Sequence, residues 1–168
     1  MLSFSSVRGF KIALALVAAM AAAACSKNPD ADGANGLGAG GAGIATPGSL
    51  KDFATNVGDR VFFDSDSSDL TAASQATLDK QARWLQQYGR YTITVEGHAD
   101  ERGTREYNIA LGQRRAEVTK NYLAAKGIPA SRMHTISYGK ERPVAVCDDI
   151  SCWSQNRRAV TVLGGGNS

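Results

Sequence analysis

The sequence is poor in the residues that build catalytic and metal centres. Its 168 residues include only three cysteines and two histidines, His98 and His134, which lie far apart in the chain. There is no GxGxxG motif that opens a helix, no GxxxxGKS/T, no GxSxG and no HExxH. A second cysteine pair that would complete a metal site is also missing. We therefore expect no cofactor, no metal and no catalysis of these classes.

The charge of the chain gives no sign of nucleic-acid binding. The formal net charge is +3 and the isoelectric point is 8.8, but Arg8 and Lys11 belong to an N-terminal segment that we expect to be removed. Without them the net charge is about +1 (3 − 2). No long basic stripe remains in the mature chain, so a nucleic-acid partner is not expected.

The N-terminus has the pattern of an export signal. The thirteen apolar residues Ile12–Ala24 are too few to span a bilayer but are typical of a signal peptide, here residues 1–24. Small residues precede Cys25 directly, which predicts lipidation of that cysteine. Lipoprotein signals usually have Leu three residues before the cysteine, where this chain has Ala22. The alternative is ordinary cleavage after an Ala-x-Ala site, which leaves a free thiol in an oxidising compartment.

The next segment is predicted to be a linker. Residues 25–49 would form the lipidated N-terminus and a flexible connection, because Ser26–Gly48 contains seven glycines and almost no bulky apolar residues. The alternative is a tail with no role. A folded domain is expected over residues 50–163, followed by a flexible tail of residues 164–168.

Strand and helix patterns alternate within the predicted domain. Period-two alternation or short apolar runs indicate strands, and apolar stripes with caps and glycine stops indicate helices. The predicted strands are residues 61–63, 91–97, 134–138 and 157–163, and the predicted helices are residues 71–88 and 106–126. Residues 143–154 are expected to be irregular. The pattern predicts an α/β domain (an α+β sandwich) of βαβαβ type, with a mixed sheet and helices on one face.

Arg115 is placed where an arginine is not expected. It lies on the apolar stripe of its helix, four residues after Leu111 and three before Val118. A buried guanidinium needs a partner, and Asp100 lies in the loop before the helix. One interpretation is a structural Arg115–Asp100 pair. The other is a zwitterion clamp, in which Arg115 binds a ligand carboxylate and Asp100 binds an ammonium group.

Two further cysteines predict a disulfide. Cys147 and Cys152 enclose four residues, and export favours a local bond over a metal site. Closing this loop would contribute about 2 kcal/mol on the chain-entropy model.

Other acidic residues carry weaker patterns. Asp64, Asp66 and Asp69 resemble the start of an EF-hand loop, but position six is not Gly and position twelve, Gln75, is not Glu. Calcium binding is therefore not expected. A hydrolase of the glycosidase type that uses loop carboxylates or a histidine stays as an alternative, with these residues as candidates: Glu96, His98, Asp100 and Glu101.

Several long blocks resemble a known family. They are TVEGHADERGTREYN (94–108), NIALGQRRAEVTKNYLAAKGI (108–128), ISYGKERP (136–143) and SQNRRAV (154–160). They resemble the OmpA-like C-terminal domain family, and within it the peptidoglycan-associated lipoproteins. The resemblance covers residues 57–163 and includes the lipoprotein signal outside them. The Cys147–Cys152 pair is not part of the family pattern.

The resemblance implies a binding site for the diaminopimelate of the peptidoglycan stem peptide. Asp100 and Arg115 match the two gripping positions, with the family spacing of fifteen intact. Asn108 and Leu111 would shape and close the pocket. Asp66 matches an acidic position at the pocket mouth, although it is equally well explained as a turn residue. Gly103 and Thr104 are expected to donate hydrogen bonds to the ligand. Arg114 is expected to be solvated, and Asn156 and Arg157 are expected to brace the end of the sheet.

The resemblance also implies a cellular role. The chain would be an outer-membrane lipoprotein of the Tol–Pal system, anchored by lipid and facing the periplasm. It would bind peptidoglycan without catalysis, with TolB as a further partner, and support envelope integrity and cell division. Serine rather than aspartate after Cys25 favours outer-membrane sorting. A cell-wall hydrolase that uses the loop carboxylates or His98 is a second possibility. A soluble periplasmic interaction domain is a third, which an unmodified Cys25 would reveal.

Overall fold

The computed structural model describes residues 45–165. The predicted signal peptide (1–24), Cys25 and most of the predicted linker lie outside the described residues, as do residues 166–168 of the predicted tail.

The folded part starts a few residues before the predicted boundary at residue 50. Ala45 and Gly48 are buried. The Gly48 carbonyl accepts hydrogen bonds from the Tyr91 hydroxyl and from Nη2 of Arg90, both at 2.8 Å. Residues 45–49, predicted as the end of the linker, therefore pack on the domain. Glycine composition alone did not reveal these contacts, because they depend on side chains more than forty residues away.

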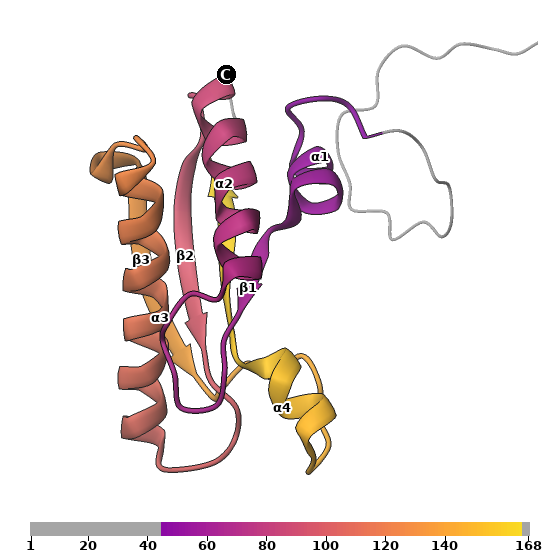
Figure 1. Cartoon of the computed structure of the whole chain (residues 1–168), viewed down its shortest axis with the longest axis vertical. Coiled ribbons are helices and arrows are strands. Elements are labelled where there is room, and N and C mark those ends of the chain that lie inside the picture. Colours follow the sequence, from indigo (N-terminus) through magenta and orange to yellow (C-terminus); the bar gives the residue numbers. More distant parts are fainter. Residues whose placement is uncertain (1–44, 166–168) are drawn as a thin grey trace, which may run out of the picture. The chain divides into compact units, whose positions relative to one another are not determined.

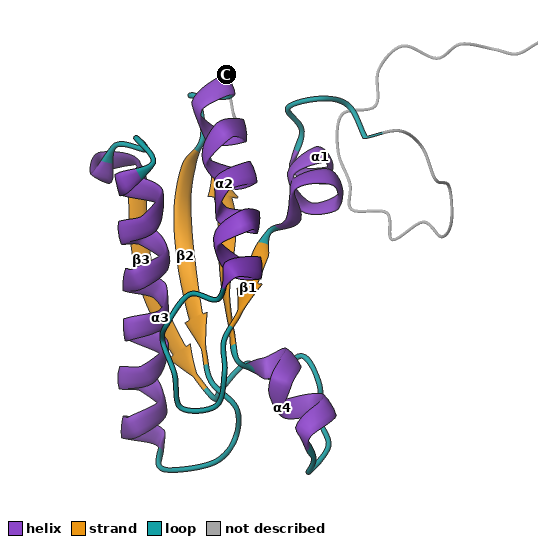
Figure 2. Cartoon of the chain, in the orientation of Figure 1, coloured by secondary structure: helices purple, strands orange, loops and turns teal. Residues whose placement is uncertain are grey.

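The domain is built on one four-stranded mixed sheet with the order β1-β4-β2-β3 (Figure 2). β2 and β3 are parallel, whereas β4 is antiparallel to both β1 and β2. The strands are β1 Arg60–Phe62, β2 Thr92–His98, β3 Met133–Gly139 and β4 Arg158–Gly164. The predicted mixed sheet with a helical crossover is confirmed.

Two long helices cover one face of this sheet (Figure 1). α3 packs on β2 and β3, and α2 packs beside β1. The helices and turns are α1 Leu50–Asp52, η1 Phe53–Gly58, α2 Ala72–Gln87, α3 Arg105–Ala125, η2 Ala130–Arg132 and α4 Ile150–Asn156. None of the described helices is both long enough and apolar enough to cross a bilayer.

The core lies between the helices and the sheet. Alternate residues of β2, Ile93 and Val95, are buried against Leu78 and Leu85 of α2 and Leu123 of α3. Phe53, Trp84 and Tyr91 extend the core toward the N-terminal end of β2, with the Phe53 and Trp84 ring centroids 4.9 Å apart. Burial of this apolar surface is the main stabilising term of the domain.

Helix ends form where the sequence predicts them. The Thr71 side chain, predicted as a cap, accepts a hydrogen bond from a backbone amide in the first turn of α2. Thr104, which was predicted as a ligand donor and not as a cap, does the same for α3. α3 ends in a Schellman arrangement, in which Gly127 has φ of 96° and the Ile128 amide donates to the Leu123 carbonyl at 3.1 Å.

α3 lies unusually close to β2 because two glycines face each other. A Cβ on Gly97 would overlap the carbonyl of Gly112, and a Cβ on Gly112 would overlap the Ser137 hydroxyl. This close approach brings the first half of α3 down onto the end of β2, where the predicted site residues lie.

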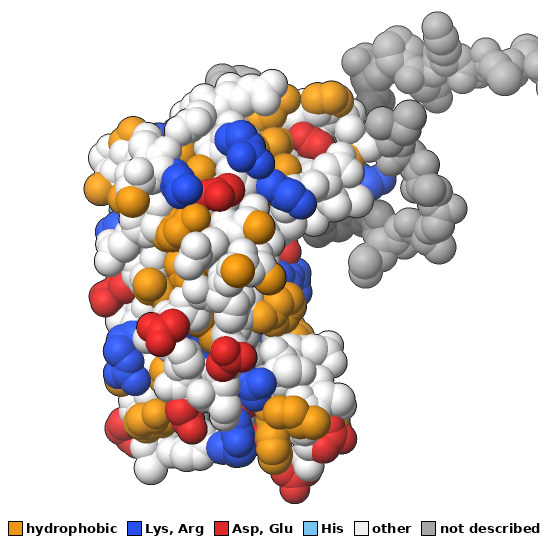
Figure 3. Space-filling view, viewed as in Figure 1, with side chains coloured by type: hydrophobic (Ala, Val, Ile, Leu, Met, Phe, Trp, Pro, Cys, Tyr) orange, Lys and Arg blue, Asp and Glu red, His pale blue; other side chains and the backbone are white. Residues whose placement is uncertain are grey.

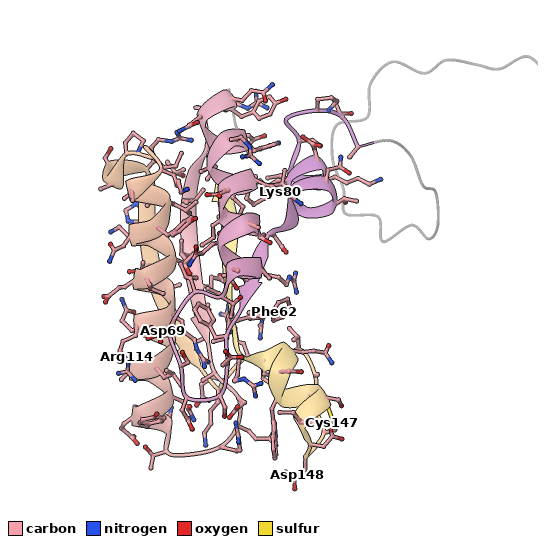
Figure 4. The ribbon with its side chains drawn as sticks, in the orientation of Figure 1. Phe62, Asp69, Lys80, Arg114, Cys147 and Asp148 are labelled. Carbon is pink, nitrogen blue, oxygen red and sulfur yellow. A yellow bond between two sulfur atoms is a disulfide. The ribbon has the colours of Figure 1, made fainter. Side chains whose placement is uncertain are left out.

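Four elements were not predicted from the sequence, and one of them, η2, lies between α3 and β3. α1 and η1 precede β1, and α4 lies in the segment expected to be irregular. α4 begins where the Asp149 side chain accepts a hydrogen bond from the Ser151 amide at 2.7 Å. The predicted Cys147–Cys152 disulfide is present and ties the loop before α4 to its first turn. Figure 4 shows Cys147 and Asp148 at the tip of this projection.

Candidate ligand-binding site

Asp100 lies just after β2, where its carboxylate is almost buried. Its Oδ1 accepts hydrogen bonds from the Arg102 backbone amide and Nε, both at 3.2 Å. Its Oδ2 accepts from Nη2 of Arg102 at 2.6 Å and from Nη1 of Arg157 at 3.3 Å. Burial alone would raise the pKa of Asp100, but these hydrogen bonds outweigh it and hold the pKa below its ordinary value.

Arg115 is completely buried, with 0% of its surface exposed. Its guanidinium donates to three main-chain carbonyls: Ser67 from Nε at 2.8 Å, His98 from Nη1 at 2.9 Å and Asp64 from Nη2 at 3.1 Å. It also lies over the Phe63 ring, 5.2 Å from the centroid. Burial lowers the pKa of Arg115 to about 10, so the group stays charged at neutral pH.

The predicted structural pair between Arg115 and Asp100 is not formed. Among the described residues no ion pair joins them, because three carbonyls satisfy Arg115 and two other arginines satisfy Asp100. The two groups are nevertheless neighbours, since Arg115 binds the carbonyl of His98, two residues before Asp100. Each still influences the other electrostatically, and Asp100 opposes the lowering of the Arg115 pKa.

Arg102 covers the Asp100 carboxylate and was not identified from the sequence. Besides its bonds to Asp100, its Nη2 donates to the Ser65 hydroxyl at 2.7 Å, and its guanidinium stacks on the Trp153 ring at 4.4 Å. Nε1 of Trp153 donates in turn to Oε1 of Glu101 at 2.8 Å. The only signal in the sequence was an arginine two residues after an aspartate in one loop, which is common on protein surfaces.

The residues predicted to shape the pocket are packed beneath this loop. Asn108 is 1% exposed, and its Nδ2 donates to the Arg102 carbonyl at 2.7 Å. Leu111 is 3% exposed. Together they support the loop and the helix from which Arg115 reaches. That they shape and close a ligand pocket stays a prediction.

Gly103 and Thr104, predicted as ligand donors, have structural partners. Gly103 has φ of 84°, and its carbonyl accepts from Nζ of Lys140 at 2.8 Å. The Thr104 oxygen accepts from the Tyr107 amide at 3.2 Å as the cap of α3. The Thr104 hydroxyl hydrogen is not committed by this bond, and the bond to the Gly103 carbonyl does not involve the Gly103 amide. Donation to a ligand therefore stays a prediction for both residues.

Other predicted positions can also be placed. Asp66 is exposed and is the one non-glycine residue with positive φ, 53°, among the described residues, which is typical of a turn. It adds to the negative potential around Arg102 and Arg115. Arg114 is exposed and points outward from α3, as predicted (Figure 4).

Asn156 and Arg157 hold the end of the sheet to neighbouring loops, as predicted, and Arg157 also contacts Asp100 in the candidate site. Asn156 accepts from the Val144 amide at 2.9 Å and donates to the Ala145 carbonyl at 2.7 Å. Nε of Arg157 donates to the Phe63 carbonyl at 3.0 Å while its Nη1 reaches Asp100. Arg157 therefore links the β1–α2 loop to the candidate site.

His98 is badly placed for the hydrolase alternative. Its ring is 2% exposed, and neither ring nitrogen has a hydrogen-bond partner among the described residues. Burial and the nearby charges of Arg158, Arg142 and Arg60 lower the pKa of His98 to about 4. Glu96 alternates with the buried Val95 on β2, on the sheet face away from the helices. A buried, neutral imidazole cannot reach a substrate in solvent.

The surface around the site does not form a broad field of one sign. On the face that carries α2 and α3, acidic and basic side chains are interspersed (Figure 3). Recognition at this site would therefore come from a few placed groups rather than from a general electrostatic attraction.

Comparisons with known proteins agree on one family. The model of the OmpA family matches residues 62–157. The chain is 66% identical to the peptidoglycan-associated lipoprotein of Rhizobium meliloti (strain 1021), over 94% of this chain and 88% of that protein. It is 46% identical to the protein of the same name from Pseudomonas aeruginosa (strain PAO1), over 87% and 91% of the two chains.

Solved structures give the same result. The crystal structure of the peptidoglycan-associated lipoprotein from Burkholderia pseudomallei is similar, with a TM-score of 0.64 and 39% identity over 68% of this chain and 98% of that chain. The C-terminal domain of Helicobacter pylori MotB has the same fold, with a TM-score of 0.59 and 21% identity over 63% of this chain and 84% of that chain.

Proposed function

The chain belongs to the OmpA family and, within it, to the peptidoglycan-associated lipoproteins, and from this we propose that its domain binds peptidoglycan without catalysis. The bound group would be the diaminopimelate of the stem peptide. The observation that carries the proposal is the nearly buried Asp100 carboxylate beside a buried Arg115 with which it forms no direct pair. Opposite charges held apart in this way match the ammonium and carboxylate at the end of diaminopimelate.

Binding would proceed by exchange of partners. Arg102 is 42% exposed in its side chain and covers Asp100, so a ligand ammonium would displace it. A guanidinium has five N–H donors, and carbonyls use three of those on Arg115. The remaining two donors would receive the ligand carboxylate once the β1–α2 loop, which supplies the Asp64 and Ser67 carbonyls, moves aside.

The cellular role follows from the same family resemblance. We propose that Cys25 is lipidated, that the lipid anchors the chain in the outer membrane, and that the domain faces the periplasm. Several acyl chains would anchor it stably, at about 0.8 kcal/mol per buried CH₂. TolB and the Tol–Pal system are proposed partners. Mass spectrometry of the mature N-terminus tests the anchor, and an unmodified Cys25 would contradict it.

A titration with synthetic stem peptides tests the clamp from the side of the ligand. We expect the peptide that contains diaminopimelate to bind at least tenfold more tightly than one with lysine, which keeps the ammonium but lacks the second carboxylate, a difference of about 1.4 kcal/mol. This comparison needs no change at Arg115, whose loss would disturb the fold. Equal affinity for the two peptides would contradict the clamp.

Substitution of Asp100 tests the other half of the clamp. Asp100→Asn keeps the shape but removes the charge that would bind the ammonium, so affinity should fall by about 2 kcal/mol, or roughly thirtyfold. Asp69→Asn, an exposed residue of the β1–α2 loop, is the matched control. Circular dichroism confirms folding, and sedimentation with labelled sacculi shows whether any fragments are released.

A further inference from the structure

β3 is an edge strand with one side unpaired. It is the last strand of the sheet, so among residues 45–165 no strand lies on its outer side (Figure 2). Exposed edges are usually protected by charged side chains or proline, which prevent another chain from pairing with them. The seven residues of β3 include no proline, lysine, arginine, aspartate or glutamate, and Ile136 is 38% exposed. The edge is therefore open to another strand.

The register shows which main-chain groups of β3 are free. The Thr161 amide of β4 donates to the Asp59 carbonyl on the β1 side, so Val95, opposite Thr161 on β2, points its own amide and carbonyl toward β3. In a parallel pair a residue bonds to the neighbours of the residue opposite it, and Val95 lies opposite Thr135. The amide and carbonyl of Thr135 therefore point outward, as do those of Ser137 two residues on. No described residue bonds to them on that side.

One side of α3 lies over this edge. Nε2 of Gln113 donates to the Thr135 hydroxyl at 3.2 Å and to Oε1 of Glu117 at 2.9 Å. Residues spaced three and four apart from Gln113 fall on the same side of the helix. We call this set the edge stripe. Its members are all exposed or half-buried: Glu106, Ala110, Gln113, Glu117, Lys120 and Ala124.

The free edge of β3 is complementary to itself. A two-fold axis at Thr135 would pair two copies of β3 antiparallel, with Thr135 opposite its counterpart and Ser137 opposite Met133. The two Thr135 residues would exchange two hydrogen bonds, and each Ser137 amide would donate one more to a Met133 carbonyl. The Met133 amide adds none, because it is already bonded to the Ala130 carbonyl.

The same axis brings opposite charges of the edge stripe together. It passes close to Gln113, which bonds to the centre of β3. A residue seven after Gln113 then faces a residue seven before it, so Lys120 of each copy faces Glu106 of the other. Within the described part of one chain neither of these two residues forms an ion pair. Glu117 faces the small Ala110 rather than a like charge.

We propose that the β3 edge and the edge stripe form a self-association surface, on which two copies of this chain join their sheets into one. This inference goes beyond the proposed binding of peptidoglycan and does not depend on it. Arg115 lies two residues from Gln113, about 200° around the helix, so the surface and the candidate site are on opposite sides of α3.

Sedimentation equilibrium of the full-length chain, at a solvent density that matches the detergent, tests the surface. We expect an equilibrium between monomer and dimer. Lys120→Glu replaces two ion pairs by two like-charge contacts and should raise the dimer dissociation constant about tenfold. Lys120→Glu combined with Glu106→Lys restores opposite charges and should bring the constant back to within about threefold of its original value. The matched control Lys80→Glu makes the same charge change at an exposed position of α2 and should leave the constant as it is (Figure 4).

A cysteine cross-link locates the axis. Gln113→Cys places two thiols face to face and should give a covalent dimer on oxidation. Arg114→Cys is the next residue of α3 but lies outside the edge stripe, so it should give only the background of the unsubstituted chain.

Three results would overturn the proposal. A chain that stays monomeric at every concentration would leave the β3 edge to an extended segment of another protein. A dimer that Lys120→Glu does not weaken, or that cross-links equally through residues 113 and 114, would join through another surface. Titration of the Lys120→Glu variant with the stem peptide should give the original affinity, which keeps the result for the surface separate from the result for the clamp.

Discussion

The candidate site has two parts whose arginines are used in different ways. We call Arg115 and the main-chain carbonyls that it binds the floor, and Arg102 and the side chains that it binds the rim. Arg115 in the floor is wholly buried and binds only main-chain carbonyls, which come from three separate positions in the chain. Arg102 on the rim is partly exposed and binds side chains, those of Asp100 and Ser65. Arg115 is therefore bonded to the main chain of the fold, and in the proposed binding a ligand reaches it only after the β1–α2 loop moves. Arg102 can exchange its side-chain partners for those of a ligand directly.

The largest effect that this comparison predicts is on stability. Arg115→Ala should lower the free energy of unfolding by about 3–5 kcal/mol, because it leaves three buried carbonyls without a donor. Urea unfolding measures the loss. The neighbouring Arg114→Ala removes an exposed arginine and should change stability by no more than about 0.5 kcal/mol. If Arg115→Ala lowers the free energy of unfolding by less than about 1 kcal/mol, Arg115 contributes no more to stability than Arg102 on the rim, and the comparison is wrong.

The pH dependence of stability should also come from the buried side of the site. The main-chain carbonyl of His98 accepts a hydrogen bond from Arg115, and the imidazole ring of His98 has a pKa of about 4 in the folded protein. Because that pKa lies below the unfolded value of about 6.5, the unfolded chain takes up the proton first. Stability is therefore full above the unfolded pKa and falls as the pH drops toward 4.

Between pH 7 and pH 5 this single group should cost about 2 kcal/mol. The variant His98→Phe should flatten that part of the profile, measured by urea unfolding at several pH values, whereas His134→Phe at an exposed position should leave it as it is. An unchanged profile in His98→Phe would mean that other groups carry the pH dependence.

The smallest stability effect is expected on the rim. Arg102→Ala should lower the free energy of unfolding by only about 1 kcal/mol, because the Arg102 side chain is partly exposed and the nearly buried Asp100 carboxylate keeps its bonds to Arg157 and to the backbone amide of residue 102. It should also raise the affinity for the stem peptide roughly threefold, since the ligand ammonium no longer competes with a guanidinium for Asp100. Titration calorimetry measures the change, with Arg105→Ala as a control that removes another exposed ion pair. If affinity falls instead, Arg102 is a ligand contact rather than a cover.

The floor and the rim also differ in how far the sequence predicts them. Arg115 stood out because its position on an apolar stripe follows from helical periodicity, and Thr71 and Gly127 mark helix ends by local chemistry. These features depend on neighbours within a few residues. The structural pair between Arg115 and Asp100 was wrong, because carbonyls from the β1–α2 loop and from the end of β2 meet Arg115 only in the folded chain.

The rim depends almost wholly on contacts between distant parts of the chain. Arg102 meets Ser65 and Trp153, which are 37 and 51 residues away, and no local pattern indicates either contact. α4 was missed because its seven residues are too few for a periodic signal and the segment includes a disulfide loop. The disulfide itself was predictable, because it depends only on two nearby cysteines and the expected compartment.

The attachment of Gly48 to Arg90 and Tyr91 has a mechanical consequence. These residues precede β2, whereas Asp100 follows it, so the point where the chain enters the domain and the point of ligand contact are separated by about 23 Å of one strand. In the proposed role, a pull between membrane and wall would run along the axis of β2. The bonds from β2 to its two neighbours lie across that axis. They would be sheared together rather than unzipped one after another, so the whole strand would carry the load at once.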